Sequence, residues 1–480
     1  MRNPYDVVII GGGITGASVA RELSRYRLKI ALVEKEAELA FGVSKSNSGI
    51  IHPGTQNPPD SLKGALCVEG NRLTRQIAKE LGVDFKEVGE LIVIFSEADI
   101  PRLLEIKKDA EQLGVPGLAI VGRDWLAEHE PNLSREAVAA LYAPTAGIIS
   151  PYRMVYDLAE NAKNNGAEII TSSKVSNIKK TTDGFEISTS KGTLFSKYLV
   201  NAAGLFADEI SAMVGVGGFK IRPRKGEEFL LDKKREQIVN HILFPLPTPS
   251  SKGILVIKTS DGNPMIGPTA DDIDDKEDKS TSDAGLAKVL DGVRKMIPTI
   301  DAGDIIAYFA GLRPAAGDDF IIRHEAQVPG FINVAGIQSP GLTAAPAVVK
   351  MVVGLLGKAG LPLRKKWFFK KYRAPSVHLF AVPWSRTKKL IAEDAAYGDI
   401  VCRCEMVSAK EVRDAIKRGA RTLDGIKFRT RAQAGRCHGG FCTTRIMKIM
   451  HEELGLPFTG ITKRGEGTEI VKEERVNRNP

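Results

Sequence analysis

The first 34 residues carry the pattern that most restricts the fold of this chain. Residues 5–10 (YDVVII) form a largely apolar, β-branched run, which is typical of a strand buried on both faces of a parallel sheet. A glycine-rich turn at 11–16 (GGGITG) leads into a helical apolar pattern over 17–27 and a second apolar run over 29–33. A strand–turn–helix–strand unit of about 30 residues predicts an α/β fold whose first half binds a nucleotide.

The glycines of this turn suit the binding of a dinucleotide. Gly11 permits a tight turn, Gly13 lets a pyrophosphate approach the backbone, and Gly16 lets the helix pack closely on the strand. The helix that follows offers N–H groups and the positive end of its dipole to the phosphates. Glu34 ends the second strand, where its carboxylate can accept hydrogen bonds from a ribose diol and would repel a 2′-phosphate. The pattern favours NAD or FAD over NADP, and a structural turn that binds no ligand is the alternative.

Glycine-rich turns that recur late in the chain help to distinguish NAD from FAD. The turn at 201–204 (NAAG) and the turn at 336–343 (GIQSPGLT) each follow a predicted strand. A helix is predicted to begin near Thr343, directly after the second turn, so its N–H groups could face the pyrimidine carbonyl of an isoalloxazine. This layout favours FAD, a long cofactor that lies across interleaved segments.

The charge of the chain is concentrated near its C-terminus. Apolar residues make up 43% and charged residues 26%, a balance that excludes a disordered chain. The formal net charge is +10, but residues 1–360 sum to −3 and residues 361–480 sum to +13. A basic last quarter is compatible with nucleic acid, an anionic membrane surface or an acidic partner.

Motifs spread over residues 4 to 360 follow one another in the order of a known family. They are GGGITG (11–16), EK (34–35), SNSGIIH (46–52), SKG (251–253), DGNPMIGPTA (261–270), GLRP (311–314) and SPGLTAAP (339–346). In order and spacing they resemble the D-amino-acid-oxidase superfamily and, within it, most closely the FAD-dependent glycerol-3-phosphate oxidases and dehydrogenases. The L-2-hydroxyglutarate oxidases share the Asn-Ser-Gly-x-Ile-His pattern and are the nearest competitors.

The resemblance implies a fold of the α/β class, α+β overall, in which a Rossmann-like FAD-binding domain is interleaved with a substrate domain built on an antiparallel sheet. The FAD-binding segments would be 1–80, 146–215 and 311–360, and the substrate-domain segments 81–145 and 216–310. The resemblance also implies the FAD-binding residues, which are Gly11, Gly13, Ile14, Thr15, Gly16, Glu34, Lys35, Ser46, Asn47, Ser48, Val175, Ala203, Gly204, Gly311, Ser339, Gly341, Leu342 and Thr343.

The family's reaction, oxidation of sn-glycerol 3-phosphate to dihydroxyacetone phosphate, needs a base for the hydroxyl proton and a hydride acceptor, which the flavin supplies at N5. His52 is the expected base, since imidazole titrates near neutral pH. Arg313 would grip the anionic end of the substrate in bidentate fashion, and Lys252 would bind its phosphate as a point charge. The alternatives are a structural histidine, an arginine paired with an acid in the core, and a solvated lysine.

Two other functions stay open from the sequence. The substrate could be a 2-hydroxy or amino dicarboxylate such as L-2-hydroxyglutarate. Alternatively, the chain could be an electron-transfer subunit of a larger complex that oxidises no small substrate of its own, although the presence of both His52 and Arg313 argues against this.

Four of the five cysteines lie close together, as Cys402-x-Cys404 and Cys437-x4-Cys442. Their spacing and flanking residues, VCRCE and GRCHGGFC, resemble the bacterioferritin-associated-ferredoxin-like [2Fe–2S] domain, which would occupy 401–460. Four thiolates are the ligand set of such a cluster, although a zinc site or four free thiols would use the same residues. The short glycerol-3-phosphate oxidases lack this domain. The departure puts direct use of oxygen in doubt and favours an electron-acceptor protein or partner subunits.

Residues 361–400 contain three prolines and many bases, and we expect an extended linker there, with a polar tail at 461–480. Within it, RKKWFFKKYR (364–373) could stack on nucleic acid, sit on an anionic membrane, or pack its aromatics on the flavoprotein with its bases outward. We favour the third and expect no nucleic-acid partner. No signal peptide is visible, and the longest apolar run is too short to span a bilayer. The expected location is cytoplasmic, or peripheral on the inner face of the membrane.

Overall fold

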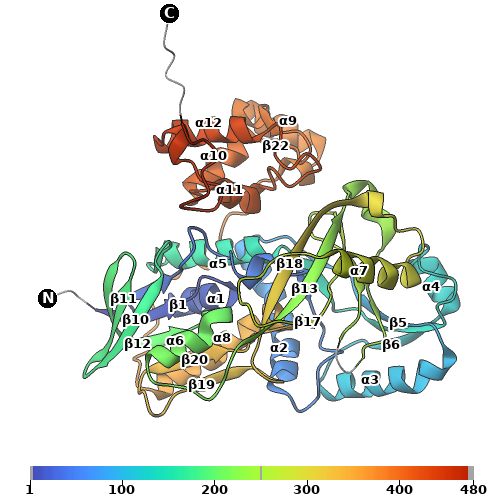
Figure 1. Ribbon diagram of the computed structural model, residues 1–480, viewed down its shortest axis with the longest axis horizontal. Coiled ribbons are helices and arrows are strands. Elements are labelled where there is room, and N and C mark those ends of the chain that lie inside the picture. The colour runs from blue at the N-terminus through green and yellow to red at the C-terminus, as the bar shows by residue number, and fades with distance from the viewer. Residues whose placement is uncertain (1–3, 249–250, 474–480) are drawn as a thin grey trace, which may run out of the picture. The chain divides into compact units, whose positions relative to one another are not determined.

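The N-terminal strand–turn–helix–strand pattern forms as the sequence predicts. Strand β1 (Tyr5–Ile10) leads into helix α1 (Ile14–Leu23), and strand β2 (Ile30–Val33) pairs in parallel with β1. The computed structural model describes residues 4–248 and 251–473. These residues divide into a larger unit (4–33, 40–169, 175–248 and 251–373) and a smaller unit (34–39, 170–174 and 374–473), both drawn in Figure 1.

A mixed sheet of eight strands, parallel at its centre, carries the nucleotide-binding pattern. Its order is β10 (Val175–Thr181), β11 (Gly184–Thr189), β12 (Gly192–Asn201), β1, β2 and β9 (Glu168–Ile170), and β20 (Phe331–Ala335) and β19 (Ile321–His324) extend it from β12. The strands β2, β1, β12 and β20 are parallel. Every residue of β2 and β20 is buried, as expected for strands covered on both faces.

Helices pack beside this sheet in the larger unit. Helix α1 packs on α5 (Pro151–Asn164) and on α8 (Gly341–Lys358), and α8 also packs on α2 (Leu62–Leu81), as Figure 1 shows. The short helix α6 (Ala207–Met213) contacts β20. The longest apolar run was expected to be too short to span a bilayer, but it lies in α8, which alone among the described residues is long and apolar enough to cross a membrane, and 56% of which is buried inside the protein. Its packing on α1 and α2 is that of a core helix.

A second, largely antiparallel sheet of nine strands forms the other part of the larger unit. Its order is β17 (Asp271–Asp272), β13 (Arg222–Leu231), β16 (Pro264–Gly267), β15 (Leu255–Lys258), β14 (Ile242–Pro245), β5 (Glu90–Ile94), β7 (Ala139–Ala143) and β6 (Ala119–Gly122), with β18 (Ile305–Ala315) beside β13. Helices α3 (Ile100–Gln112), α4 (Arg123–His129) and α7 (Asp283–Met296) contact it. The expected combination of a flavin-type α/β sheet with an antiparallel sheet is therefore confirmed.

A small third sheet places the candidate base. Strand β8 (Gly147–Ile149) pairs antiparallel with both β3 (Ile50–Ile51) and β4 (Phe85–Glu87). Both residues of β3 are buried, and His52 follows directly at its end. The base is thus attached to a short, fixed strand.

The smaller unit is built from four helices and one hairpin. The helices are α9 (Trp384–Glu393), α10 (Ala409–Lys417), α11 (Leu423–Thr430) and α12 (Thr443–Leu454), and the hairpin is β21 (Ile400–Cys402) with β22 (Val407–Ser408). Helix α10 starts at a reciprocal cap in which Ser408 and Glu411 each bond the other's backbone N–H. The core includes Val412, Ile426 and Ile446, which are fully buried.

Two expectations about irregular segments differ from the structure. Residues 361–400 are not one extended linker, because 361–373 belong to the larger unit and helix α9 lies within the rest. The predicted polar tail is anchored at its start, since Ile461 is buried and the N–H of Leu423 donates to the carbonyl of Thr462. Residues 474–480 of that tail lie outside the described residues.

Candidate active site

The glycines of the first turn have different structural roles. A methyl group on Gly11, whose φ is +110°, would lie 2.3 Å from the carbonyl oxygen of Ala202, and one on Gly16 would lie 1.9 Å from that of Gly11. These two glycines are required by the protein's own backbone packing. The nearest atom to a methyl group on Gly13 would be the hydroxyl oxygen of Ser44, at 3.1 Å. Gly13 is therefore the position where a ligand could approach the backbone.

The loop at 43–49 closes against this turn. The N–H of Ile14 donates to the hydroxyl of Ser44 at 2.9 Å, a residue that sequence reasoning missed. The side-chain amide of Asn47 donates to the carbonyls of Val43 and Ser44 and accepts from the N–H of Gly49. Asn47 therefore shapes the loop with its side chain. Its neighbours Ser46 and Ser48 are half-buried.

Gly311 on β18 fits tightly against the same loop, because a methyl group there would lie 2.2 Å from the carbonyl oxygen of Ser46. The predicted FAD residues Ala203 and Gly204 follow β12, and Thr15 lies in the first turn of α1, which follows β1. Strand β1 lies between β2 and β12, so these turns share one edge of the sheet. Val175 is buried at the start of β10.

Glu34 and Lys35 directly follow β2 but are grouped with the smaller unit. The N–H of Glu34 donates to the carbonyl of Ile170, and its carboxylate accepts the N–H of Glu36 at 2.9 Å. In the same segment, Glu38 accepts the N–H of Arg421 and pairs with Arg429 at 2.8 Å. The stretch expected to hold a ribose is thus ordered by its own hydrogen bonds.

The start of helix α8 holds the candidate base in place. Some of its polar groups are therefore used within the protein and are not available to a ligand. The N–H of His52 donates to the hydroxyl of Thr343 at 2.9 Å, so this hydroxyl is used within the protein. The N–H of Gly341 donates to the carbonyl of Gln338 at 2.6 Å. Leu342 is half-buried beside them, whereas Ser339 is exposed. The side chain of Thr343 is therefore a positioning group for His52.

His52 is held in its neutral form. Burial, and secondarily the nearby ammonium of Lys252, keep the pKa of His52 well below its usual value. Its carbonyl accepts the side-chain amide of Asn71 at 2.9 Å and the thiol of Cys67 at 3.6 Å. A neutral imidazole on a fixed backbone can accept a proton at neutral pH without first losing one.

Lys252 is a buried cation whose ammonium has no hydrogen-bond partner within the described chain. Burial lowers its pKa, whereas Cys67 and Glu90 act in the opposite direction. An uncompensated buried ammonium is costly, so it favours an anionic ligand.

Arg313 on β18 is the second cation of this group and is half-buried. Its guanidinium donates to the carbonyl of Thr269 at 3.1 Å, and burial lowers its pKa while Glu228 raises it. In turn, burial raises the pKa of Glu228 to about 7. The charge of Lys252 lowers the pKa of His52, and the charge of Arg313 lowers that of Lys252, which places the three predicted catalytic residues in one neighbourhood.

Other buried polar residues of the larger unit escaped sequence reasoning. Glu90 is fully buried at the start of β5, where Thr55 donates to one carboxylate oxygen while the other has no partner among the described residues. Burial raises the pKa of Glu90 to about 7. Both amide atoms of Gln56 are likewise buried without a partner in the described chain. The one available signal was a glutamate directly before the apolar run LIVIF at 91–95.

The four C-terminal cysteines lie in the smaller unit as two pairs. The sulfurs of Cys404 and Cys437 are 3.7 Å apart, and the thiols of Cys402 and Cys442 are hydrogen-bonded to each other. Within residues 4–248 and 251–473, no three His, Cys, Asp or Glu side chains converge on a single ion. Two pairs fit a two-iron cluster, in which each iron takes two thiolates, better than a tetrahedral zinc site.

The turn between the second pair of cysteines points N–H groups at sulfur. The backbone N–H groups of Gly439, Gly440 and Phe441 donate to Cys437 and lower the pKa of its thiol against the effect of burial. Gly439 has φ +89°, which favours glycine there. Cys402 and Cys442 are buried, whereas Cys404 is exposed, so one edge of this site faces solvent.

Comparisons with known proteins match two families along the chain. Residues 6–355 match the family described as FAD dependent oxidoreductase, and residues 400–452 match the BFD-like [2Fe-2S] binding domain. The glycerol 3-phosphate dehydrogenase of Caloramator mitchellensis is 41% identical over 97% of this chain and 98% of its own. The L-2-hydroxyglutarate dehydrogenase of Escherichia coli K12 is 30% identical over 71% and 90%, respectively.

A solved structure gives the same fold. The FAD-bound L-alpha-glycerophosphate oxidase of Mycoplasma pneumoniae matches with a TM-score of 0.74 and 32% identity, covering 78% of this chain and all of its own. The match with a BFD-like domain confirms a [2Fe–2S] site as predicted, and the flavin family confirms FAD as the other cofactor.

Proposed function

Because the chain belongs to the FAD dependent oxidoreductase family and carries a BFD-like [2Fe-2S] binding domain, we propose that it oxidises sn-glycerol 3-phosphate to dihydroxyacetone phosphate. The observation that carries the proposal is the pair of half-buried cations, Lys252 and Arg313, near a neutral His52. Two positive charges suit a phosphate dianion. The names of relatives at up to 41% identity point to the same substrate.

The residues of the larger unit divide the work of this reaction. Bound FAD supplies the hydride acceptor. His52 takes the proton of the substrate's middle hydroxyl as the C–H hydride leaves, so that a C=O bond forms. Arg313 and Lys252 hold the phosphate and thereby orient the middle carbon. Thr343 and Asn71 keep His52 in place through its backbone N–H and carbonyl.

The FAD itself would be held by the turn at 11–16, the loop at 43–49 and the N-terminus of α8. Gly13 is the open position of the turn, and the first N–H groups of α1 and α8 offer partial positive charge. These elements come from three separate stretches of the chain. A long cofactor across them is consistent with the family match.

L-2-hydroxyglutarate is the competing substrate, because relatives of that name match over most of their length. It is also a dianion, but its two carboxylates lie at opposite ends of the molecule. A phosphate places both charges on one group, which a clustered Lys252 and Arg313 suit better. A substrate screen with the purified flavoprotein distinguishes the two.

We further propose that electrons leave the enzyme through the cluster site of the smaller unit toward an acceptor protein or partner subunit. The support is that Cys404 is exposed, while Phe441 and Met406 nearby in sequence expose 84% and 48% of their surface. Exposed large apolar side chains beside a redox centre are typical of a transient docking site. A [2Fe–2S] cluster supplies one-electron transfer there.

The test is anaerobic mixing of the holoenzyme with glycerol 3-phosphate. We expect the flavin absorbance to bleach and one equivalent of dihydroxyacetone phosphate to form per flavin. A flavin that stays oxidised with saturating glycerol 3-phosphate but bleaches with L-2-hydroxyglutarate would assign the second substrate. A flavin that responds to neither would favour an electron-transfer subunit without its own substrate.

A further inference from the structure

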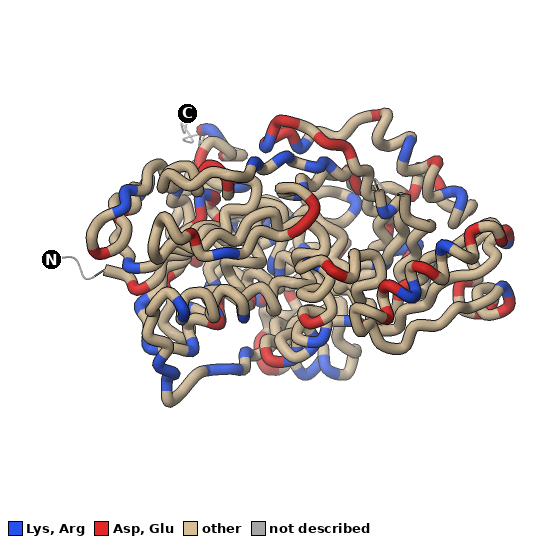
Figure 2. The backbone as a smooth tube through the Cα atoms, turned by 90° about the horizontal axis from the view of Figure 1, so that it is seen from below, with Lys and Arg blue, Asp and Glu red and all other residues tan. Residues whose placement is uncertain are grey.

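The segment at 364–373 (RKKWFFKKYR), here called the basic aromatic strap, has no part in either site. It belongs to the larger unit and follows helix α8 after a short turn. Elsewhere, Lys and Arg are largely interspersed with Asp and Glu along the backbone (Figure 2). Six of the ten strap residues are basic and the other four are aromatic, so none is acidic. Three of the aromatic residues are consecutive, at 367–369.

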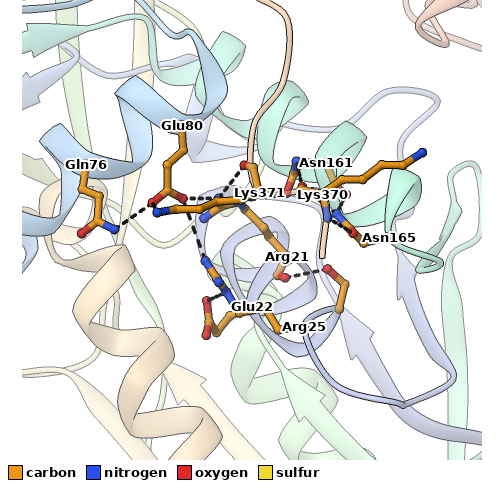
Figure 3. Close-up of polar contacts among 10 residues, drawn as sticks. Arg21, Glu22, Arg25, Gln76, Glu80, Asn161, Asn165, Lys370 and Lys371 are labelled. Carbon is orange, nitrogen blue, oxygen red and sulfur yellow. Dashed lines mark hydrogen bonds and ion pairs between the residues drawn. The ribbon is translucent and has the colours of Figure 1, made fainter. Parts of the chain in front are cut away.

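The backbone of the strap is pinned along its length. At its start, the N–H of Arg27 donates to the carbonyl of Arg364 at 2.8 Å, and the N–H of Lys366 donates to the carbonyl of Arg25 at 2.9 Å. In the middle, the N–H of Lys370 donates to the side chain of Asn165 at 2.8 Å. Figure 3 shows this contact, together with that of Asn161 to the Lys370 carbonyl at 2.9 Å. The backbone of the strap therefore cannot rearrange freely to bury its exposed side chains.

The end of the strap is held by ion pairs. Lys371 pairs with Glu80 at 3.1 Å, and the same buried carboxylate also binds Arg21 (Figure 3). Arg373 pairs with Asp157 at 3.0 Å and with Glu160. These two cations are thus neutralised by acids of the larger unit.

Of the four remaining bases of the strap, Lys366 donates to the carbonyl of Asn165. Arg364, Lys365 and Lys370 are exposed, and none of them forms an ion pair with any residue of the described chain. Arg27, whose N–H holds the start of the strap, is exposed as well. The strap consequently presents three exposed cations that no acid of the described chain compensates, and Arg27 adds a fourth beside its start.

The aromatic side chains of the strap divide into one inward and three outward. Phe369 turns inward, where the guanidinium of Arg25 lies 4.3 Å from its ring centroid. Trp367 is 96% exposed, Phe368 73% and Tyr372 68%. Because the backbone is pinned, these three rings cannot be covered by a simple collapse of the strap. The sequence expectation that the aromatics pack on the flavoprotein holds for Phe369 alone.

We propose that the basic aromatic strap seats the larger unit on an anionic lipid bilayer, with Trp367, Phe368 and Tyr372 in the headgroup region and the three bases against lipid phosphates. Tryptophan and tyrosine prefer the membrane–water interface, and clustered bases are attracted to anionic lipids. A protein partner is the weaker reading because lysine, which supplies two of the three free cations, is depleted at protein interfaces.

The experiment uses the full-length holoenzyme and extruded vesicles of phosphatidylcholine, with or without 30% phosphatidylglycerol. We expect flotation with the anionic vesicles only, together with a blue shift of tryptophan emission that Trp367→Ala removes. Arg364→Gln/Lys365→Gln/Lys370→Gln should weaken vesicle binding by about a hundredfold, from roughly fivefold per charge. Trp367→Ala/Phe368→Ala should weaken it at least tenfold, and anaerobic flavin reduction should stay unchanged in both variants.

The matched control is Trp384→Ala, which removes another tryptophan that is 69% exposed but lies outside the strap. It should leave vesicle binding and the blue shift intact. Equal binding to neutral vesicles, or binding that the strap variants do not weaken, would overturn the proposal. So would absence of vesicle binding with a concentration-dependent dimer that the same strap variants dissociate, since the occupant would then be a second copy.

Discussion

The two candidate sites differ in their exposure to solvent. In the larger unit, the side chains of His52, Lys252 and Arg313 are half-buried, and burial lowers the pKa of each. In the smaller unit, Cys404 is exposed, and Cys437 is held by N–H groups of a glycine turn. The first site depends on desolvation, whereas the second depends on local backbone geometry.

This difference follows from the chemistry that each site would perform. Moving a hydride and a proton requires fixed donors and acceptors and the exclusion of water, so a buried and charged cavity is suitable. An electron can leave without any atom being transferred, so one edge of a cluster can face the solvent or a partner. The buried site should therefore respond strongly to changes of single side chains, and the two sites should be separable by mutation.

The largest expected effect is complete loss of the cluster in Cys404→Ser. Removing one of four thiolates should abolish the visible absorption and iron content of the [2Fe–2S] centre. Because His52, Lys252 and Arg313 all belong to the larger unit, reduction of the flavin by substrate should proceed within about twofold of the normal rate. Cys67→Ser is the matched control for iron content, since Cys67 lies in the other unit. Iron retained at full occupancy in Cys404→Ser would contradict the assignment.

His52→Gln should give the next largest effect, a loss of the rate of flavin reduction with no change at the cluster site. Loss of a general base typically costs about 10²- to 10⁴-fold in rate. Stopped-flow reduction of the flavin under anaerobic conditions measures it, and FAD content should be normal. His451→Gln, which changes an exposed histidine of the smaller unit, is the control. A rate that falls less than tenfold would assign the proton to another group.

Much of the architecture could be predicted because it depends on local pattern. The buried runs at 5–10 and 29–33 form strands, and the glycines expected at the tight turn and at the helix–strand contact, Gly11 and Gly16, leave no room for a methyl group. The four cysteines were found by their spacing within the motifs Cys-x-Cys and Cys-x4-Cys, although each pair of neighbouring sulfurs joins one cysteine of the first motif to one of the second. In these regions the relevant contacts lie within a few tens of residues.

The parts that escaped prediction depend on distant contacts. Thr343 fixes the backbone of His52 across 291 positions of the chain, and no local pattern indicates that its hydroxyl is used in this way. Glu90 is buried because β5 lies between β7 and β14 inside the second sheet. Helix α9 was missed because most of its ten residues are polar and it lies in a segment rich in prolines and bases, and only Leu390 is buried.

Glu90→Gln tests how strongly burial affects a carboxyl group near the first site. The expected effect is a change of about 3 kcal/mol in the pH dependence of the free energy of unfolding. The folded pKa of Glu90, about 7, exceeds its ordinary 4.5, so the folded protein holds an extra proton between those pH values. Stability therefore falls as pH rises through this window, by about 1.4 kcal/mol per pH unit. Glu90→Gln lacks this loss.

Chemical denaturation at pH 5 and pH 8 measures it. The free energy of unfolding of Glu90→Gln, relative to the unchanged protein, should rise by about 3 kcal/mol between the two pH values. Glu228 has a similarly raised pKa but is present in both proteins, so its contribution cancels. Glu87→Gln, which changes an exposed carboxylate on β4, should show no such rise. A difference independent of pH would mean that Glu90 stays ionised in the folded protein.

Lys252→Met should give the smallest of these effects and the one most specific to the substrate. A hydrogen bond to a charged group contributes about 1.5–3 kcal/mol, which corresponds to an increase in KM for glycerol 3-phosphate of roughly 10- to 150-fold. Lys258→Met is the control, because the ammonium of Lys258 pairs with Glu236 at 3.0 Å and this residue lies only six positions from Lys252.

Lys252→Met also removes the positive charge that lowers the pKa of His52. The lower limb of the pH profile of kcat/KM should consequently shift to higher pH in Lys252→Met and not in Lys258→Met. A raised KM without that shift would place Lys252 on the substrate but away from the base, and an unchanged KM would leave Arg313 as the sole phosphate ligand of the buried site.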